Sequence, residues 1–263
     1  MPHGTPVRGD ENADGTQSIR RAASILRRIA QASTEGAKLS AISSTLDLPR
    51  STAHRILKCL VDEGFVSHDH AKRRYFLGHL THELGLAVPP DLLDVAKWRP
   101  VVEKVARRTG ATSYLMARSG SEAVCLVKSE GSSVIRVIPV EVGQRRFLGL
   151  GAGAAALLAG LAPDDAEAVI KSIAPYLERD QGPSEDDLRE LVANTRKTGF
   201  AVSRGNVVKD VIGLGMAIPN RNGVPLFSIS IASLASQVDQ KRLEFYCCVL
   251  KEEIDAVLQA EPA

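Results

Sequence analysis

The polar and cationic side chains between residues 50 and 58 have the types and spacing needed to bind nucleic acid. Arg50 and Arg55 can each donate two parallel hydrogen bonds to a guanine base. Ser51 and Thr52 can reach bases or phosphates, and a later run of three cations suits phosphates or the minor groove. For His54, a DNA contact and a plain place at the flank of a helix are equally expected. The residues predicted to bind DNA are Arg50, Ser51, Thr52, His54, Arg55, Lys58, Lys72, Arg73 and Arg74.

Charge is distributed unevenly along the 263 residues, whose net charge is only +2. Residues 16–77 contain eleven Lys and Arg against five Asp and Glu, whereas residues 1–15 and 78–263 each carry a net charge of −2. This asymmetry indicates a polyanionic partner for the basic segment only. A cationic helix face alone is more often plain solvated surface. Its combination with a turn at Pro49, a basic hairpin and this local charge favours DNA binding.

Apolar residues at helical spacing predict the elements that would position these side chains. A first helix is expected from Ser18, and a short second helix has Ser40 as its N-cap. Pro49 suits the first position of a third helix, which would close at Gly64 because glycine readily adopts the left-handed conformation there. Two strand-like runs then flank the cationic tip, at residues 65–67 and 74–77. This order predicts a winged helix-turn-helix.

The rest of the chain alternates strand-like and helix-like runs, which predicts a sheet flanked by helices, of class α/β or α+β. Strands are expected at 112–118, 123–129, 134–140, 199–203, 212–219 and 226–233, with a hairpin turn at 220–223. Helices are expected at 91–109, after Gly153, and at 164–177, 185–198 and 239–259. The predicted domains are a disordered tail (1–15), a winged helix-turn-helix (16–78), a linker helix (79–90) and a larger second domain (91–263).

Several kinds of enzymatic chemistry have weak support in the second domain. Gly149, Gly151 and Ala154 match the G-x-G-x-x-A fingerprint of dinucleotide-binding proteins, so an NAD-linked oxidoreductase is a weighed alternative, but a lone match is weak. All six histidines precede residue 83, which leaves this domain without a His to act as general base or metal ligand. No C-x-x-C pair occurs among the four cysteines, so buried, reduced thiols are expected. We therefore expect no enzyme, no metal and no cofactor.

The motif at residues 48–57, LPRSTAHRIL, followed by EGFV at 63–66 and RYFLG at 74–78, closely resembles the IclR family of bacterial regulators. The resemblance extends from about residue 18 to residue 258. It implies a winged helix-turn-helix, a linker helix and a GAF-like effector-binding domain with a central antiparallel sheet. It also implies a dimer or a dimer of dimers on a palindromic operator.

The same resemblance implies an effector pocket beside the sheet. Carried over to this chain, its residues are Leu148, Leu150, Gly151, Ala152, Gly153, Ser203, Gly213 and Ser230. Glycines at a helix start allow a ligand to approach backbone N–H groups, although they can equally serve close packing of helix on sheet. Many family members carry a His where this chain has Gly149, a Gly-Lys-Ala where it has residues 154–156, and a Ser where it has Ala232. The loss of these polar groups favours a more apolar acid.

We therefore expect a ligand-responsive transcriptional repressor or activator of catabolic genes that senses a small organic acid, aromatic acids included. The expected partners are double-stranded operator DNA, the effector and further copies of the chain, as a homodimer or homotetramer. A polar start without a hydrophobic segment, and no apolar run of about 18–20 residues, predict a cytoplasmic protein without membrane contact. One further alternative is a second domain that serves only dimerisation.

Overall fold

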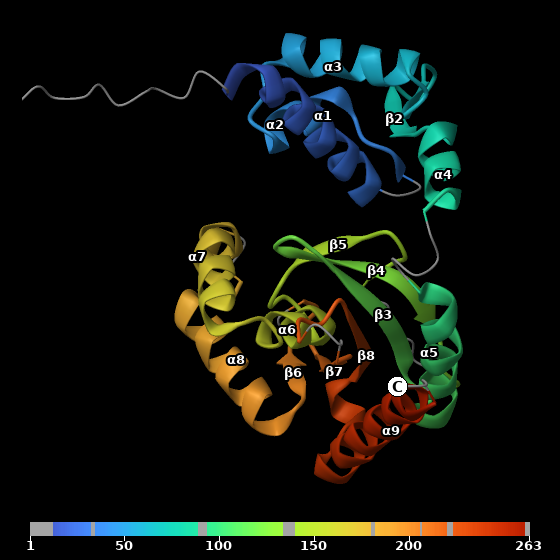
Figure 1. Cartoon of the computed structure of the whole chain (residues 1–263), viewed down its shortest axis with the longest axis vertical. Helices are drawn as coiled ribbons and strands as arrows, with labels where there is room; N and C mark the ends of the chain where they lie inside the picture. The colour runs from blue at the N-terminus through green and yellow to red at the C-terminus, as the bar shows by residue number, and fades with distance from the viewer. Residues whose placement is uncertain are drawn as a thin grey trace, which may run out of the picture. The chain divides into compact units, whose positions relative to one another are not determined.

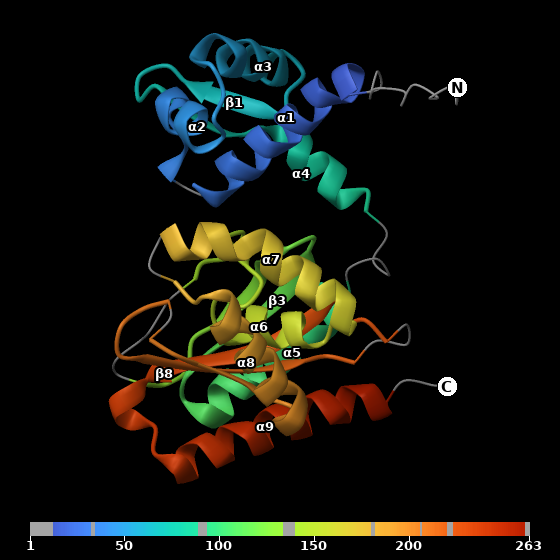
Figure 2. The same ribbon diagram turned by 90° about the vertical axis from the view of Figure 1, so that its left-hand side faces the viewer.

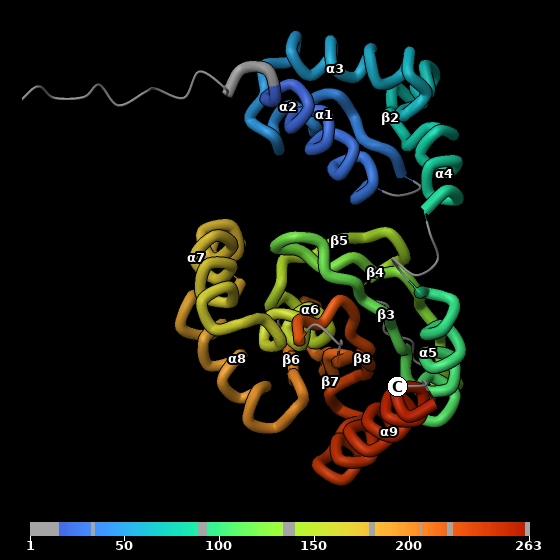
Figure 3. Tube along the Cα trace, in the orientation of Figure 1, coloured from blue at the N-terminus to red at the C-terminus, as the bar shows by residue number. Residues whose placement is uncertain are grey.

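The computed structural model of the chain describes residues 13–32, 35–88, 94–133, 140–179, 182–205, 207–219 and 223–260. The chain divides into two compact units, residues 1–89 and 90–263, which are described one after the other (Figure 1, Figure 3). In this described part, no helix is both long enough and apolar enough to cross a lipid bilayer.

Three helices, a hairpin and a fourth helix form the first unit. In chain order they are α1 (Ala13–Gln31), α2 (Leu39–Thr45), α3 (Arg50–Asp62), β1 (Val66–Asp69), β2 (Arg74–Leu77) and α4 (His79–Leu86). Their apolar faces enclose one core, in which Ile25, Ile42 and Leu57 are fully buried. The predicted winged helix-turn-helix is confirmed. α1 begins at residue 13, inside the segment predicted to be disordered.

Local backbone chemistry sets the limits of α3. The Ser43 hydroxyl donates a hydrogen bond of 2.6 Å to the Leu48 carbonyl, and the Leu48 N–H donates one of 3.0 Å to the Ser43 carbonyl, which closes the turn before the helix. Pro49 occupies the N-cap, one residue before the predicted place. Gly64, at φ 78°, ends the helix where the sequence predicts, since few other residues adopt this conformation without strain.

The predicted N-cap of α2 is wrong. The helix begins at Leu39 and its N-cap is Lys38, which makes no side-chain hydrogen bond to the helix. Ser40 therefore lies within the first turn. The segment before α2 is fixed instead by tertiary pairing, because Ala37 exchanges two backbone hydrogen bonds of 2.9 Å with Tyr75 of β2. Sequence-local capping rules do not include such a contact.

The second unit contains a six-stranded sheet whose described strands all pair antiparallel, in the order β5-β4-β3-β8-β7-β6. The strands are β3 (Thr112–Ser119), β4 (Glu122–Ser129), β5 (Arg145–Phe147), β6 (Ala201–Arg204), β7 (Val211–Ala217) and β8 (Phe227–Leu234). An antiparallel sheet does not provide the strand–helix–parallel strand unit that a dinucleotide fingerprint requires. The NAD-linked alternative is therefore not supported by the topology.

Helices cover both faces of this sheet (Figure 1, Figure 2). α5 (Val95–Thr109) and α9 (Gln240–Gln259) cover one face, and α6 (Ala152–Ala159), α7 (Pro163–Arg179) and α8 (Glu185–Thr198) lie on the other. Each face has its own apolar core. Leu115 and Val249 belong to the core under α5 and α9, whereas Leu157 and Ile173 belong to the other.

The predicted elements of this unit are present with shifts of one to a few residues, apart from two segments that lie largely outside the described residues. These are the strand at 134–140, of which only residue 140 is described, and the turn at 220–223, of which only residue 223 is described. One strand was missed. β5, at Arg145–Phe147, pairs with β4 along three positions, in a segment that the sequence analysis did not assign to the sheet.

Candidate DNA-binding surface and effector cavity

α3 presents a polar face because its apolar face is packed into the core. Ala53, Leu57 and Leu60 are buried, and they recur at helical spacing along one side. The predicted side chains that are exposed on the other side are Arg50, Ser51, His54, Arg55 and Lys58, and Cys59 and Asp62 of the same helix are exposed as well. Thr52 is half-buried, which makes it less accessible than the other predicted residues of this helix.

A wide, open groove brings the start of α3 together with the β1–β2 hairpin. It is lined by Lys38, Leu39, Ser40, Arg50, Ser51, His54, His68, His70, Lys72, Arg73 and Tyr75. Predicted residues of the helix and the hairpin therefore share one concave surface, and four of its lining residues are Lys or Arg. Thr52, Arg55 and Lys58 do not line it. A groove with this charge suits a polyanion.

Arg74 has a different place from its two cationic neighbours. Its guanidinium donates hydrogen bonds of 2.8 Å and 2.9 Å to the carbonyls of Glu35 and Gly36. These contacts fix the chain ahead of α2 to strand β2. The geometry therefore supports a structural role for Arg74, and its predicted contact with phosphates or the minor groove stays a prediction. Arg73, in contrast, lies at the exposed hairpin tip with a φ of 53°, and Lys72 makes only a long, exposed ion pair of 3.8 Å with Asp69.

Two histidines of the groove, His68 and His70, were not predicted. The His68 ring stacks on Tyr75 and meets His70 edge-on, with 4.3 Å between ring centroids in both cases. Burial lowers the pKa of His68, the nearby His70 and His54 lower it further, and Asp69 opposes them. Among the described residues, no three His, Cys, Asp or Glu side chains are placed to hold a metal ion. The pairing of His68 with Tyr75 across the hairpin is the feature that could have indicated this cluster.

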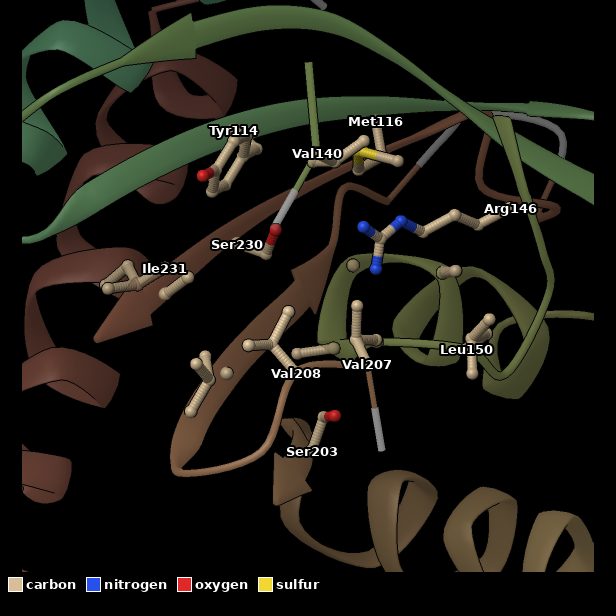
Figure 4. A pocket seen from close by; sticks show the side chains of 17 residues that line it. Tyr114, Met116, Val140, Arg146, Leu150, Ser203, Val207, Val208, Ser230 and Ile231 are labelled. Atoms are coloured by element: carbon tan, nitrogen blue, oxygen red, sulfur yellow. The ribbon is translucent and has the colours of Figure 1, made fainter. Parts of the chain in front are cut away.

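The second unit contains a partly open cavity of about 50 Å³ between the start of α6 and the sheet (Figure 4). It is lined by all but one of the predicted effector residues, namely Leu150, Gly151, Ala152, Gly153, Ser203, Gly213 and Ser230. The exception is Leu148, which is 0% exposed and belongs to the apolar core under α6 instead. Ala232, the position where many family members carry a Ser, also lines the wall.

The glycines at this site allow α6 to lie close to the sheet. A Cβ atom on Gly153 would lie 2.8 Å from the Cγ atom of Met116 and 2.9 Å from the hydroxyl oxygen of Ser230. One on Gly213 would lie 3.1 Å from the Cβ atom of Ala152. Close packing, left open by the sequence, therefore accounts for both glycines. Gly151 differs, since its φ of 86° favours glycine and its missing side chain leaves room beside Val207.

Arg146 is a charged residue of the cavity wall that the sequence analysis missed. It lies in β5 opposite Ala123, and its guanidinium extends into the cavity toward Ser230 and Val207 (Figure 4). Burial lowers its pKa, although the guanidinium stays protonated at neutral pH. Burial also raises the pKa of Tyr114, which lines the same wall and stays neutral. Successive side chains of a strand point to opposite faces of the sheet, so one of Arg145 and Arg146 must face inward. This signal can be used only when the strand itself is predicted.

Comparison with known proteins extends over both units. The profile of the family described as "Bacterial transcriptional regulator IclR C-terminal" matches residues 91–257, and that of the "IclR helix-turn-helix domain" matches residues 18–70. The HTH-type transcriptional regulator KipR of Bacillus subtilis is 31% identical over 226 residues, which is 84% of this chain and 87% of KipR.

Solved structures show the same architecture. A crystal structure of an IclR transcriptional regulator from Alicyclobacillus acidocaldarius aligns with a TM-score of 0.71 at 25% identity, covering 92% of this chain and 97% of that one. An IclR homologue from Microbacterium hydrocarbonoxydans, solved in complex with 4-hydroxybenzoate, aligns with a TM-score of 0.68 at 22% identity, covering 93% of this chain and 100% of that one. The second likeness is one of fold.

Proposed function

This chain belongs to the IclR family of bacterial transcriptional regulators, and on that premise we propose that it controls nearby catabolic genes in response to a small organic acid. The first unit binds operator DNA and the second binds the acid. The observation that carries the DNA half of this proposal is the groove that joins the start of α3 to the cationic hairpin. The cavity beside α6 carries the other half.

DNA recognition in this proposal divides between α3 and the hairpin. The exposed residues Arg50, Ser51 and Arg55 lie in the first two turns of α3, the part of a recognition helix that contacts base edges in the major groove. Arg50 and Arg55 pair with guanines, because a guanidinium matches the two acceptors of that base. Lys72 and Arg73 at the exposed hairpin bind phosphates, which position the helix without reading the sequence.

Two copies of the chain bind one operator in this proposal. Paired winged modules contact half-sites spaced about 34 Å, or a multiple of it, along the DNA. The acid binds one arrangement of the assembly better than another and thereby changes the affinity for the operator. By linkage, the operator must change the affinity for the acid by the same factor. The 4-hydroxybenzoate bound to the Microbacterium homologue supports an organic acid as the effector class.

Operator binding can be tested with the full chain. Selection from randomised oligonucleotides yields the operator, and fluorescence anisotropy then measures affinities for variants. Arg50→Ala and Arg55→Ala should each weaken operator binding by about 1–3 kcal/mol and blur the base preference. Lys241→Ala, which removes an exposed cation on α9, is the matched control and should leave binding unchanged. Unchanged affinity in both arginine variants would overturn the assignment of α3 as the reading helix.

The effector half is tested separately, by measuring operator affinity with and without 4-hydroxybenzoate and related acids. Ser230→Leu fills the cavity from β8 and should abolish the response while operator affinity without ligand stays as in the wild type. A response that persists in this variant would place the effector elsewhere. If no organic acid changes operator affinity in the wild type, the second unit has no such sensing role.

A further inference from the structure

One cation, Arg146, faces a cavity whose other described lining residues are uncharged. They are Tyr114, Met116, Val140, Leu150, Gly151, Ala152, Gly153, Ala154, Ser203, Val207, Val208, Val211, Gly213, Ser230, Ile231 and Ala232. No carboxylate occurs in this set, so a cationic group on a ligand would meet no counter-charge. No second Lys or Arg occurs among these described residues either, so they offer no partner to a second anionic group, whose unpaired burial is costly.

Arg145, the neighbour of Arg146 on the same strand, has hydrogen-bond partners for its guanidinium. Its Nε donates a hydrogen bond of 2.8 Å to a carboxylate oxygen of Glu122, and its Nη2 donates one of 2.8 Å to the Ser119 hydroxyl. Arg146 makes neither an ion pair nor a hydrogen bond with any residue that the structure describes. Adjacent strand residues face opposite sides of a sheet, so only Arg146 can reach the cavity.

The environment of Arg146 disfavours its charge in the empty protein. Burial is the first cause that lowers its pKa, and no carboxylate contributes in the opposite direction. Arg146 is half-buried, and a partly desolvated cation without a counter-charge is destabilised, a cost that an anion bound against it reduces. Arginine also presents a planar pair of donors that fits the two oxygens of a carboxylate.

We propose that Arg146 binds the carboxylate of the effector and that the effector is a monoanion with a largely apolar body. The inference rests on the proposed function, since it specifies the ligand of the same cavity. Met116, Val207 and Val208 contact the apolar body. Ser203 and Ser230, which are each 7% exposed, offer two hydroxyls that can hydrogen-bond to at most a few polar substituents of the ligand.

Isothermal titration of the full chain tests this inference, with benzoate, 4-hydroxybenzoate and hexanoate as monoanions. Benzamide replaces the carboxylate by a neutral group of the same shape, and terephthalate adds a second charge. At least one monoanion should bind, and its matched neutral or doubly charged analogue should bind about tenfold or more weakly. Operator affinity is measured with each compound at saturation.

Two adjacent arginines provide a matched pair of variants. Arg146→Met should weaken binding of the monoanion about tenfold or more, while Arg145→Met, which disrupts the Glu122 pair outside the cavity, should leave it within about threefold of the wild type. Arg146→Lys keeps the charge without the planar pair of donors and should give an intermediate affinity. The unfolding temperature of ligand-free Arg146→Met should equal or exceed that of the wild type, because an unpaired charge is removed.

Several results would overturn the inference, and they differ from failure of the proposed function. Equal binding of benzoate and benzamide, tighter binding of terephthalate, or benzoate binding that survives in Arg146→Met would each refute the role of Arg146. If benzamide changes operator affinity, the proposal that a ligand controls DNA binding stands. Only the assignment of Arg146 as the carboxylate-binding residue then fails. If no compound of the panel binds the wild type, this inference and the effector half of the proposed function fail together, whereas the DNA half is tested separately by operator binding.

Discussion

Substituting Gly153 by alanine tests how closely α6 packs on the sheet. The new methyl group would lie 2.8 Å from the Met116 Cγ atom, 2.9 Å from the Ser230 hydroxyl oxygen and 3.3 Å from that of Ser228. The Cγ atom cannot move as freely as the end of a side chain, and Ser228 is held by its 2.8 Å hydrogen bond to the Gly153 carbonyl. The helix or the sheet must therefore shift.

Two opposing effects set the expected magnitude. Replacing glycine by alanine inside a helix stabilises the folded protein by up to about 1 kcal/mol. Residue 153 lies in the first turn of α6, where the gain is smaller. Overpacking of a filled core costs about 1–3 kcal/mol. The free energy of unfolding should therefore fall by about 1–2 kcal/mol, which lowers the unfolding temperature by about 2–8 °C for a unit of this size.

Differential scanning calorimetry of the full chain measures this change, with Gly85→Ala as the control. Gly85 lies in helix α4, and no atom outside its own turn lies within 4 Å of the Cβ position. This control should keep or slightly raise the unfolding temperature, because only the helix preference changes. An unfolding temperature of Gly153→Ala at or above that of the wild type would refute the close packing of α6 against β3 and β8.

Further predictions concern the DNA-binding groove. Lys72→Ala should weaken binding to all DNA sequences alike and reduce the slope of log K against log salt by about 0.9, as expected for one lost phosphate contact; a sequence-selective loss would mean that the hairpin reads bases. Arg74→Ala should lower the stability of the first unit by about 1–3 kcal/mol, because two carbonyls lose a charged donor, while base preference stays the same in oligonucleotide selection. His68 has a lowered pKa in the free protein, and a nearby phosphate favours its protonated form, so operator affinity should rise as the pH falls below about 6.5, by up to about tenfold per pH unit. The His68→Gln variant should flatten this profile in anisotropy titrations, His82→Gln on the exposed face of α4 should not, and equal profiles in all three proteins would contradict the groove as the DNA site.

Local signals explain which parts of the fold the sequence could predict. The limits of α8 follow from Ser184, whose hydroxyl caps the helix start, and from Gly199, whose φ of 80° ends it; both residues act within one turn of themselves. The hairpin and α3 follow in the same way from Pro49, Gly64 and the alternation in the strands. Such elements are encoded by neighbours in the chain, so a single sequence reveals them.

Arg146 and β5 illustrate why the rest could not be predicted. A strand of three residues has no periodicity to detect, and it exists because β4, about twenty residues earlier in the chain, offers it a free edge. The same holds for Arg74, whose partners Glu35 and Gly36 are almost forty residues away. Leu148 was misplaced for a related reason, since it belongs to an apolar core whose other members, such as Ile170 and Leu188, lie far along the chain.

The two consecutive arginines of β5, Arg145 and Arg146, make the cavity tolerant of a one-residue shift in the pairing of β5 with β4. A slip of one residue normally exchanges the two faces of a strand and ruins an interior. Here, moving β5 so that Arg145 lies opposite Ala123 would bring Arg146 opposite Glu122, so an inward cation and an outward partner for that carboxylate would both survive. An insertion of a single residue just before this edge strand, which shifts β5 in this direction, should therefore keep a cation facing the cavity.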